Sequence, residues 1–146
     1  MHLILTIRES NLRKLKELLK KAKTKSRYKQ GWEEIGGKRN FYRSSWEVKY
    51  ARHLQNLKSY KEIKDWLHEP QTFWFDGIRR GVVSYLPDFK VFRNDGTHYW
   101  VEVKGFMDAK SATKIKRFKK YFPNETLIVI DNIWFNLNKN VKAVDI

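Results

Sequence analysis

Residues 85 to 105, YLPDFKVFRNDGTHYWVEVKG, bring two acids and a lysine into one short stretch. Asp88 follows a proline, and Glu102 and Lys104 are two positions apart. Side chains alternate along a strand, so Glu102 and Lys104 share a face if this segment is extended. Asp95-Gly96 is a hairpin turn signal, and a hairpin around it can place Asp88 beside Glu102. The pattern predicts two carboxylates and one ammonium group converging on one face of a sheet.

Metal-assisted hydrolysis of a phosphodiester is the chemistry that these residue types fit. Two neighbouring carboxylates repel each other unless a cation lies between them. Their hard oxygen ligands suit Mg²⁺, for which Mn²⁺ is an expected substitute, and the backbone carbonyl of Val103 offers another ligand. A bound metal lowers the pKa of a coordinated water and offsets charge on the phosphate. Lys104 would position that water, help to deprotonate it, or stabilise the transition state.

An ordinary polar hairpin is the competing interpretation of this stretch. Antiparallel sheets often expose one polar face, where a Glu102–Lys104 ion pair would contribute only about 0–1 kcal/mol. Two features favour a site instead. Apolar neighbours (Val101, Val103 and Phe106) indicate a largely buried strand, and Gly105 ends it where another backbone or a ligand could approach closely. The register remains open, because a one-residue shift would turn Asp88 away from Glu102.

Composition favours a nucleic-acid partner. The chain has 146 residues, enough for one domain with a real core, and 31 Lys and Arg against 16 Asp and Glu give a net charge of +15. Such an excess favours a polyanion, with DNA or RNA first and an anionic membrane surface second. The absence of cysteine excludes disulfides and thiolate zinc sites. No stretch is read as a membrane span or signal peptide, so we expect a soluble cytoplasmic protein that does not bind membranes.

The first 43 residues carry much of this charge, with 13 Lys and Arg against 4 Glu, a net +9. Leucines at 12, 15, 18 and 19 predict a helix with a narrow apolar stripe. Gly31, Gly36 and Gly37 indicate a linker after it. We expect residues 1–43 to form a basic N-terminal arm, with a short strand, a helix and a linker. Its role is open between a DNA-backbone clamp and a dimerisation element, with membrane binding the weakest option.

Residues 44–146 are expected to form the core domain. The patterns predict helices over 44–58 and 109–122, and strands over 71–75, 82–92, 98–104 and 126–130. This α-β-β-β-α-β order predicts an α/β fold in which helices flank a small mixed sheet.

Pro87-Asp88 followed by Glu102-Val103-Lys104 resembles the signature of the PD-(D/E)XK nuclease superfamily, and most closely its small phage endonucleases and resolvase-like enzymes. The similarity extends over about residues 44 to 130, because a helix containing Ser44-Ser45-Trp46-Glu47 precedes the hairpin and the basic segment Lys110–Lys120 follows it. The resemblance implies a restriction-endonuclease-like fold. It implies that Asp88 and Glu102 bind a divalent metal, that Lys104 acts at the attacking water, and that Glu47 is an additional acid. Ser44 and Glu47 equally satisfy a capping box, which gives Glu47 a structural alternative.

Other conspicuous side chains have lesser expected roles. We expect backbone contacts with DNA from the helix after the motif and, second in rank, from residues elsewhere in the core: Lys110, Lys114 and Arg117, then Arg79, Arg80, Lys49 and Arg52. Glu69 is interpreted as a solvated loop acid rather than a contact of the metal site or a partner of Arg79. The four histidines show no zinc-ligand spacing. Trp74 and Trp100 are expected in the core.

The leading hypothesis is a Mg²⁺-dependent DNA endonuclease, of a nicking or a structure-specific kind that cuts branched or junction DNA. The alternative is a non-catalytic basic protein that binds or packages DNA on a nuclease-like scaffold. RNA is a weaker third substrate, since no RNA-recognition signature is present. A homodimer would suit junction or double-strand cutting, and the sequence leaves this open.

Overall fold

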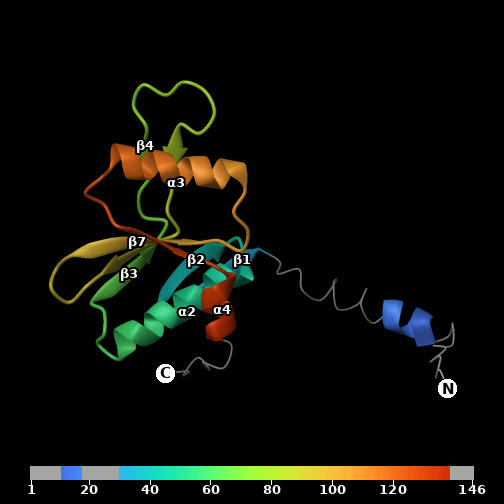
Figure 1. Ribbon diagram of the computed structural model, residues 1–146. Coiled ribbons are helices and arrows are strands. Elements are labelled where there is room, and N and C mark those ends of the chain that lie inside the picture. The colour runs from blue at the N-terminus through green and yellow to red at the C-terminus, as the bar shows by residue number, and fades with distance from the viewer. Residues whose placement is uncertain (1–10, 18–29, 139–146) are drawn as a thin grey trace, which may run out of the picture.

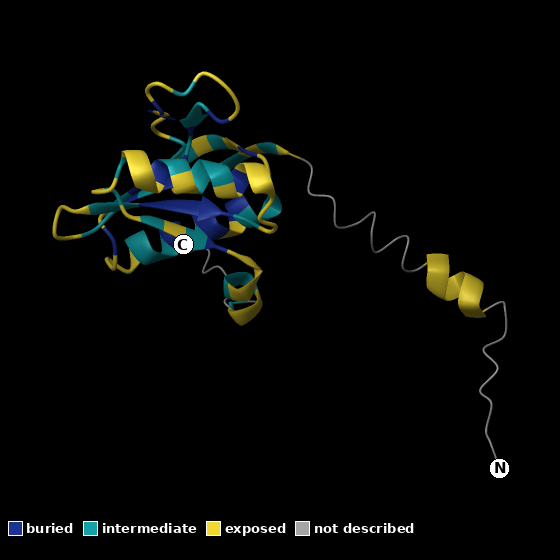
Figure 2. Ribbon diagram, turned by 45° about the horizontal axis from the view of Figure 1, so that its top comes forward, coloured by how far each residue is buried: buried dark blue, intermediate teal, exposed yellow. Residues whose placement is uncertain are grey.

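The computed structural model describes residues 11–17 and 30–138. Most of the expected arm lies outside them; residues 11–17 are helical and exposed, which agrees with the expected helix (Figure 2). The remaining elements are β1 (Gly31–Ile35), β2 (Lys38–Tyr42), α2 (Ser45–Ser59), β3 (Asp65–His68), β4 (Phe73–Trp74), β5 (Ser84–Tyr85), β6 (Phe89–Phe92), β7 (His98–Val103), α3 (Ala109–Tyr121), β8 (Leu127–Ile130) and α4 (Asn132–Leu137). Within the described ranges, no helix is long and apolar enough to cross a membrane.

A four-stranded sheet in the order β3-β6-β7-β8 forms the centre of this mixed α/β fold (Figure 1). β3, β6 and β7 are antiparallel neighbours, whereas β8 pairs with β7 in parallel. A parallel pair needs a long crossover connection, and α3 provides it here. Strands β4 and β5 form a separate pair beside α3.

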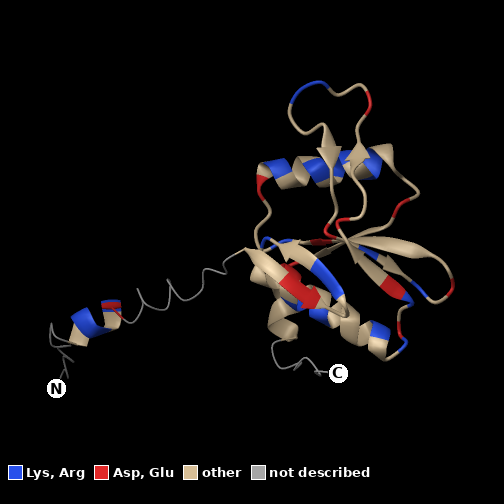
Figure 3. Ribbon diagram, turned by 180° about the vertical axis from the view of Figure 1, so that it is seen from behind, with Lys and Arg blue, Asp and Glu red and all other residues tan. Residues whose placement is uncertain are grey.

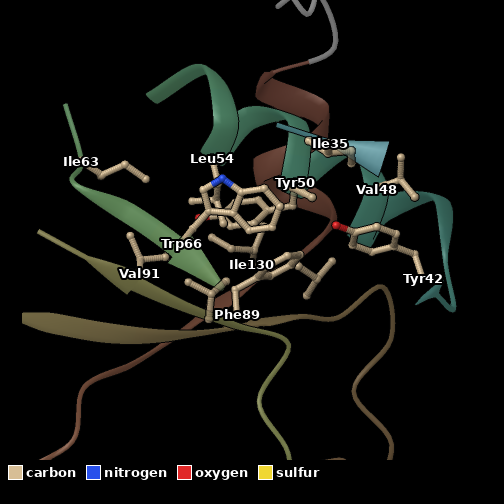
Figure 4. Packing of buried hydrophobic residues seen from close by; sticks show 13 residues of the cluster. Ile35, Tyr42, Val48, Tyr50, Leu54, Ile63, Trp66, Phe89, Val91 and Ile130 are labelled. Atoms are coloured by element: carbon tan, nitrogen blue, oxygen red, sulfur yellow. The ribbon is translucent and has the colours of Figure 1, made fainter. Parts of the chain in front are cut away.

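The two faces of the central sheet bury two different apolar clusters. On one face, Leu54 of α2 packs with Trp66, Phe89 and Val101 of the sheet (Figure 4). On the other face, Trp100 packs with Phe118 of α3 and with residues of the β4–β5 pair. Strand β7 supplies both clusters because its side chains alternate, and it is buried from Trp100 to Val103. The expectation of a buried strand holds for β7, although Phe106 beyond it is 79% exposed.

The segment expected to be a linker is a β-hairpin. Strands β1 and β2 pair antiparallel from Gly31↔Tyr42 to Ile35↔Lys38. Gly36 and Gly37 form the turn with φ of 61° and 75°, a conformation that favours glycine. Ile35 and Tyr42 are buried in the cluster that packs on α2. The packed part of the chain therefore begins before residue 44, and the Gly-Gly pair is a turn between strands rather than a break.

Two of the expected strands differ from the observed ones in position or length. The 71–75 segment contributes only the two-residue β4, and the longer strand of this region is β3, upstream at Asp65–His68. The expected 82–92 strand is divided into β5 and β6 at Pro87, which has no N–H to donate to a ladder. Trp74 is 63% exposed rather than buried, whereas Trp100 lies in the core as expected.

Helices α2 and α3 and the last two strands of the sheet lie where the sequence placed them, whereas α4 was not expected. α2 is capped by Ser44, which accepts a hydrogen bond from the Glu47 N–H. α3 is capped by Asp108, whose carboxylate accepts from the Ser111 N–H at 2.7 Å. Local caps of this kind are readable from sequence, which explains why these boundaries agree within about one residue.

Candidate functional site

Three acids lie in a row across three neighbouring strands at one end of the central sheet. The β3–β6 and β6–β7 registers, each continued by one residue, place Asp88 opposite both Glu69 and Glu102. The Glu69 N–H donates to the Asp88 carbonyl at 2.8 Å, which fixes the first of these pairings. We call this end, where β3 and β7 finish and β6 begins, the acidic end. The opposite end, which carries the Asp95-Gly96 turn, is the turn end.

Asp88 lies beside Glu102, as the hairpin alternation predicted. One Asp88 carboxylate oxygen accepts a hydrogen bond from the Val103 N–H at 2.7 Å, so Asp88 reaches across to the end of β7. Burial, followed by the charges of Glu102 and Glu47, raises the pKa of Asp88 to about 8. Two carboxylates thus converge in a setting that disfavours their both being charged.

Glu102 is buried at 7% exposure and held by one strong hydrogen bond. The Tyr85 hydroxyl donates to its carboxylate at 2.6 Å. Burial raises the pKa of Glu102 above its ordinary value, and this outweighs the opposing effects of Tyr85, Lys104 and Lys114. Burial, followed by the charge and hydrogen bond of Glu102, raises the pKa of Tyr85, which therefore remains a donor. Tyr85 was not singled out from the sequence, because the short strand β5 carries no motif.

Glu47 serves as a helix cap and also reaches the acidic end. Its carboxylate accepts from the Ser44 hydroxyl at 3.2 Å and from the N–H of Arg43, the residue before the cap, at 3.3 Å, a variant of the capping box in which the Ser44 N–H is not the donor. Burial acts to raise the pKa of Glu47, but His68 and these two donors lower it below its ordinary value. Its negative charge in turn contributes to the raised pKa values of Asp88 and Glu102. The capping and the site interpretations of Glu47 are therefore compatible.

His68 and Glu69 belong to the same group of side chains, which the sequence interpretation missed. The His68 Nε2 atom lies 3.7 Å from a Glu47 oxygen and 4.0 Å from a Glu69 oxygen. Glu69 also contributes to the raised pKa of Asp88, so it is not a solvated loop acid. In the sequence, these residues are marked only by the adjacent His68-Glu69-Pro70. Because strand β3 was not predicted, there was no reason to place them beside Asp88.

The basic residues divide into those near the acids and those elsewhere. Lys104 and Lys114 are close enough to oppose the raised pKa of Glu102, and the Lys114 ammonium lies 5.8 Å from the centre of the Tyr85 ring. Arg117 instead donates to the Val82 carbonyl. Arg52 lies 3.7 Å from Glu33 of β1. The remaining expected DNA contacts are exposed: Lys110 on α3, Lys49 on α2, and Arg79 and Arg80 in the loop between β4 and β5. Lys and Arg positions follow the length of α3 (Figure 3).

The sharp end of β7 has a different cause from the expected one. A Cβ added to Gly105 would lie 3.2 Å from the Trp46 ring. The close approach therefore comes from an indole of α2 and needs no ligand. Trp46 stacks in turn near Phe135 of α4, with ring centres 4.5 Å apart, so this contact joins both helices to the end of β7.

Residues 25–136 match the family described as protein of unknown function DUF1064, and the chain belongs to that family. The match covers β1 to β8 completely and most of α4, so the family unit includes the hairpin and the acidic end. No curated protein matched the chain.

The donors at the acidic end fit a divalent cation. Asp88 and Glu102 offer oxygen atoms only, which suits Mg²⁺. Burial raises both pKa values, and the charge of Glu102 raises that of Asp88 further; a bound cation would offset both effects. The Val103 N–H is bonded to Asp88, which holds the Val103 backbone beside the same acids.

Proposed function

We propose that the protein is a Mg²⁺-dependent DNA endonuclease with a restriction-endonuclease-like core, and that the acidic end is its active site. The convergence of Asp88, Glu102 and Glu47 beside Lys104 is the observation that carries this proposal. These residues come from α2, β6 and β7, which is the arrangement that the resemblance to PD-(D/E)XK nucleases implied. The metal, held by Asp88 and Glu102, would activate a water and neutralise charge on the scissile phosphate.

The neighbouring protein groups would orient the two metal-binding carboxylates and assist the attacking water. Tyr85 fixes the Glu102 carboxylate through its 2.6 Å hydrogen bond, and the Val103 N–H fixes Asp88. Lys104 would hold the attacking water or stabilise the developing negative charge, because its ammonium already interacts with Glu102. Fixed groups of this kind need no reorganisation when the reaction occurs.

DNA is the favoured substrate because the positive charge adjoins the acids. Lys114 of α3 lies over Tyr85, and exposed lysines continue along the helix. Such a surface attracts a phosphate backbone and would lead it past the acidic end. A sequence-independent mode of contact suits a structure-specific or nicking enzyme.

Cleavage assays on purified full-length protein test this proposal. Supercoiled plasmid and a panel of nicked, linear, flap and junction DNAs are incubated with Mg²⁺, with Mn²⁺, and with EDTA. We expect metal-dependent cleavage, and its product pattern identifies the preferred structure. Salt-sensitive binding without hydrolysis under every metal condition would overturn the endonuclease proposal and favour the non-catalytic DNA-binding alternative.

A pair of variants separates the two roles of Glu47. Glu47→Gln keeps the Ser44 bond to the residue-47 N–H and one side-chain acceptor but removes the charge, so we expect a cleavage loss of about tenfold or more with only a small change in stability. Ser44→Ala removes the cap and should cost about 1 kcal/mol of stability while cleavage persists. Unchanged cleavage in Glu47→Gln would remove this residue from the proposed active site.

A further inference from the structure

We propose a second divalent metal site, formed by Glu47, His68 and Glu69, that takes a transition-metal ion such as Zn²⁺ or Mn²⁺ through one imidazole nitrogen and two carboxylates. It differs in donor chemistry from the oxygen-only pair Asp88 and Glu102. Its existence does not depend on whether the protein cleaves DNA.

The separations between the three donor atoms fit a common ion. His68 Nε2 lies 3.7 Å from Glu47 and 4.0 Å from Glu69, and one donor atom from each residue lies within 4.8 Å of the others. Metal–ligand bonds of about 2.0–2.2 Å place neighbouring ligands about 3–4.3 Å apart. Both distances from the histidine already fall within this range, and a small side-chain rotation would close the third.

The His68 ring is the observation that points to a ligand. Its side chain is only 4% exposed, and Nε2 is buried without a hydrogen-bond partner among the described residues. Leaving such an atom unpaired costs about 1–3 kcal/mol. The ring is held between Tyr42 and Phe89, at centre distances of 4.5 and 5.3 Å, so its orientation toward the two acids is set by packing.

A comparison within the molecule argues against a simple ion pair. At the turn end, His98 Nε2 lies 2.9 Å from Glu125, a normal hydrogen bond. His68 faces two carboxylates and reaches neither, although a protonated ring would be drawn to about the same short distance. The wider spacing leaves room for an intervening atom, and the two carboxylates that face His68 favour a cation there over a water.

The backbone of Glu69 brings its side chain to the histidine. Adjacent residues of a strand point to opposite faces, so His68 and Glu69 would diverge if both were extended. Glu69 instead has φ of 44°, a left-handed conformation that costs a non-glycine residue about 1–3 kcal/mol. Its N–H bond to Asp88 holds it there. This backbone conformation places the side chains of two consecutive residues close enough to act as ligands of one metal ion.

The choice of ion follows from the donors. An imidazole nitrogen suits Zn²⁺ and other transition metals, and carboxylates add affinity for Mn²⁺. Mg²⁺ prefers all-oxygen surroundings and keeps its waters. Each Glu47 oxygen already accepts one hydrogen bond, but a carboxylate oxygen has a second lone pair available for a metal.

Metal titration of the stripped full-length protein tests the site. Zn²⁺ binding is measured by calorimetry and Co²⁺ binding by its visible absorption, in wild type and in His68→Gln and Glu69→Gln. We expect a Zn²⁺ affinity at least about tenfold weaker in both variants, with loss of the Co²⁺ band of nitrogen ligation. His98→Gln is the matched control and should bind Zn²⁺ as wild type does.

Two further results decide the proposal independently of cleavage. The double variant Asp88→Asn/Glu102→Gln should keep Zn²⁺ binding although it removes the oxygen-only pair. If wild type binds neither Zn²⁺ nor Co²⁺, or if His68→Gln and Glu69→Gln bind as tightly as wild type, the site does not exist. Should His68→Gln fail to fold, Glu69→Gln alone decides, because its side chain is partly exposed and packs less.

Discussion

Acidic and histidine side chains lie at both ends of the central sheet, but their surroundings shift the pKa values of Asp65 and Asp88 in opposite directions. At the turn end, Asp65 accepts hydrogen bonds from Lys38 and Lys58, and His98 pairs with Glu125. Burial acts to raise the pKa of Asp65, but these lysines and the Trp66 N–H lower it to about 2. At the acidic end, Asp88 has a carboxylate on each side of its row and a pKa raised to about 8.

Even within one hairpin the contrast holds. Asp95 and Asp88 belong to the same β6–β7 unit, yet hydrogen bonds from Thr97 hold the pKa of exposed Asp95 below its ordinary value. Acids at the turn end are paired as structural groups usually are, whereas those at the acidic end are gathered and, among the described residues, none forms a salt bridge with a lysine or arginine. Concentrated, desolvated charge of this kind is a feature of functional sites.

The largest expected difference between the two ends is in catalysis. Asp88→Asn removes a proposed metal ligand, so we expect Mg²⁺-dependent cleavage to fall by at least about 10²-fold. Asp95→Asn changes the same residue type at the turn end and should leave the rate within about twofold of wild type. Initial rates on supercoiled plasmid measure both. Equal loss in the two variants, or none in Asp88→Asn, would sink the assignment of the acidic end.

Stability should respond to pH in opposite directions at the two ends. In metal-free protein, native Asp88 holds its proton up to about pH 8 while the unfolded chain releases it near pH 4, so this residue lowers stability as pH rises through that window. Asp88→Asn should therefore stabilise the protein by about 1–3 kcal/mol at pH 8, and much less at pH 5.

Asp65 has the opposite sign. Its lowered pKa contributes stability above about pH 4 that is lost as pH falls toward 2. Because the side chain is 40% exposed, solvent screening limits the cost of Asp65→Asn to about 0.5–1 kcal/mol. Urea denaturation in EDTA measures Asp88→Asn at pH 5 and pH 8, and Asp65→Asn at pH 5 and pH 3. A gain in Asp88→Asn that is independent of pH would mean that its charge is not the cause.

The smallest expected difference concerns DNA binding. Lys114→Ala removes a positive charge beside the acidic end and should weaken affinity by about two- to fivefold, with the salt slope reduced by about 1. Lys64→Ala removes an exposed lysine at the turn end and should change neither. Fluorescence anisotropy with a short duplex over a range of salt concentrations, in Ca²⁺ or EDTA, provides the comparison. An equal loss of DNA affinity in Lys114→Ala and Lys64→Ala would indicate nonspecific electrostatic attraction, with no preferred DNA-binding surface beside the acidic end.

Sequence reasoning reached the parts of the fold that depend on local pattern. The caps of α2 and α3 and the Asp95-Gly96 turn are set by neighbouring residues, so their positions were predictable. The turn also fixed the β6–β7 register and thus the approach of Asp88 to Glu102. Strand β3 was missed because its four residues are too short and too unevenly buried to show a period of two.

The β1–β2 hairpin was missed for a different reason. Its exposed positions are mostly charged, and its Gly-Gly turn was interpreted as a break in a basic arm. Only the packing of Ile35 and Tyr42 against α2 shows that it belongs to the core. The many charged residues of this segment suggested an exposed arm, whereas two buried side chains, Ile35 and Tyr42, decide its structure.

The sequence by itself determined that Glu102 and Lys104 share a face and that Asp88 can meet them, because side-chain alternation and a short hairpin turn are local geometry. The tertiary structure alone decided the rest. It brought Glu47, His68 and Glu69 from α2 and β3 to the same end of the sheet, and it buried the acids deeply enough to raise the pKa of Asp88. Burial and charge repulsion depend on residues that are distant in sequence, so the spacing of residues within one strand could not predict them.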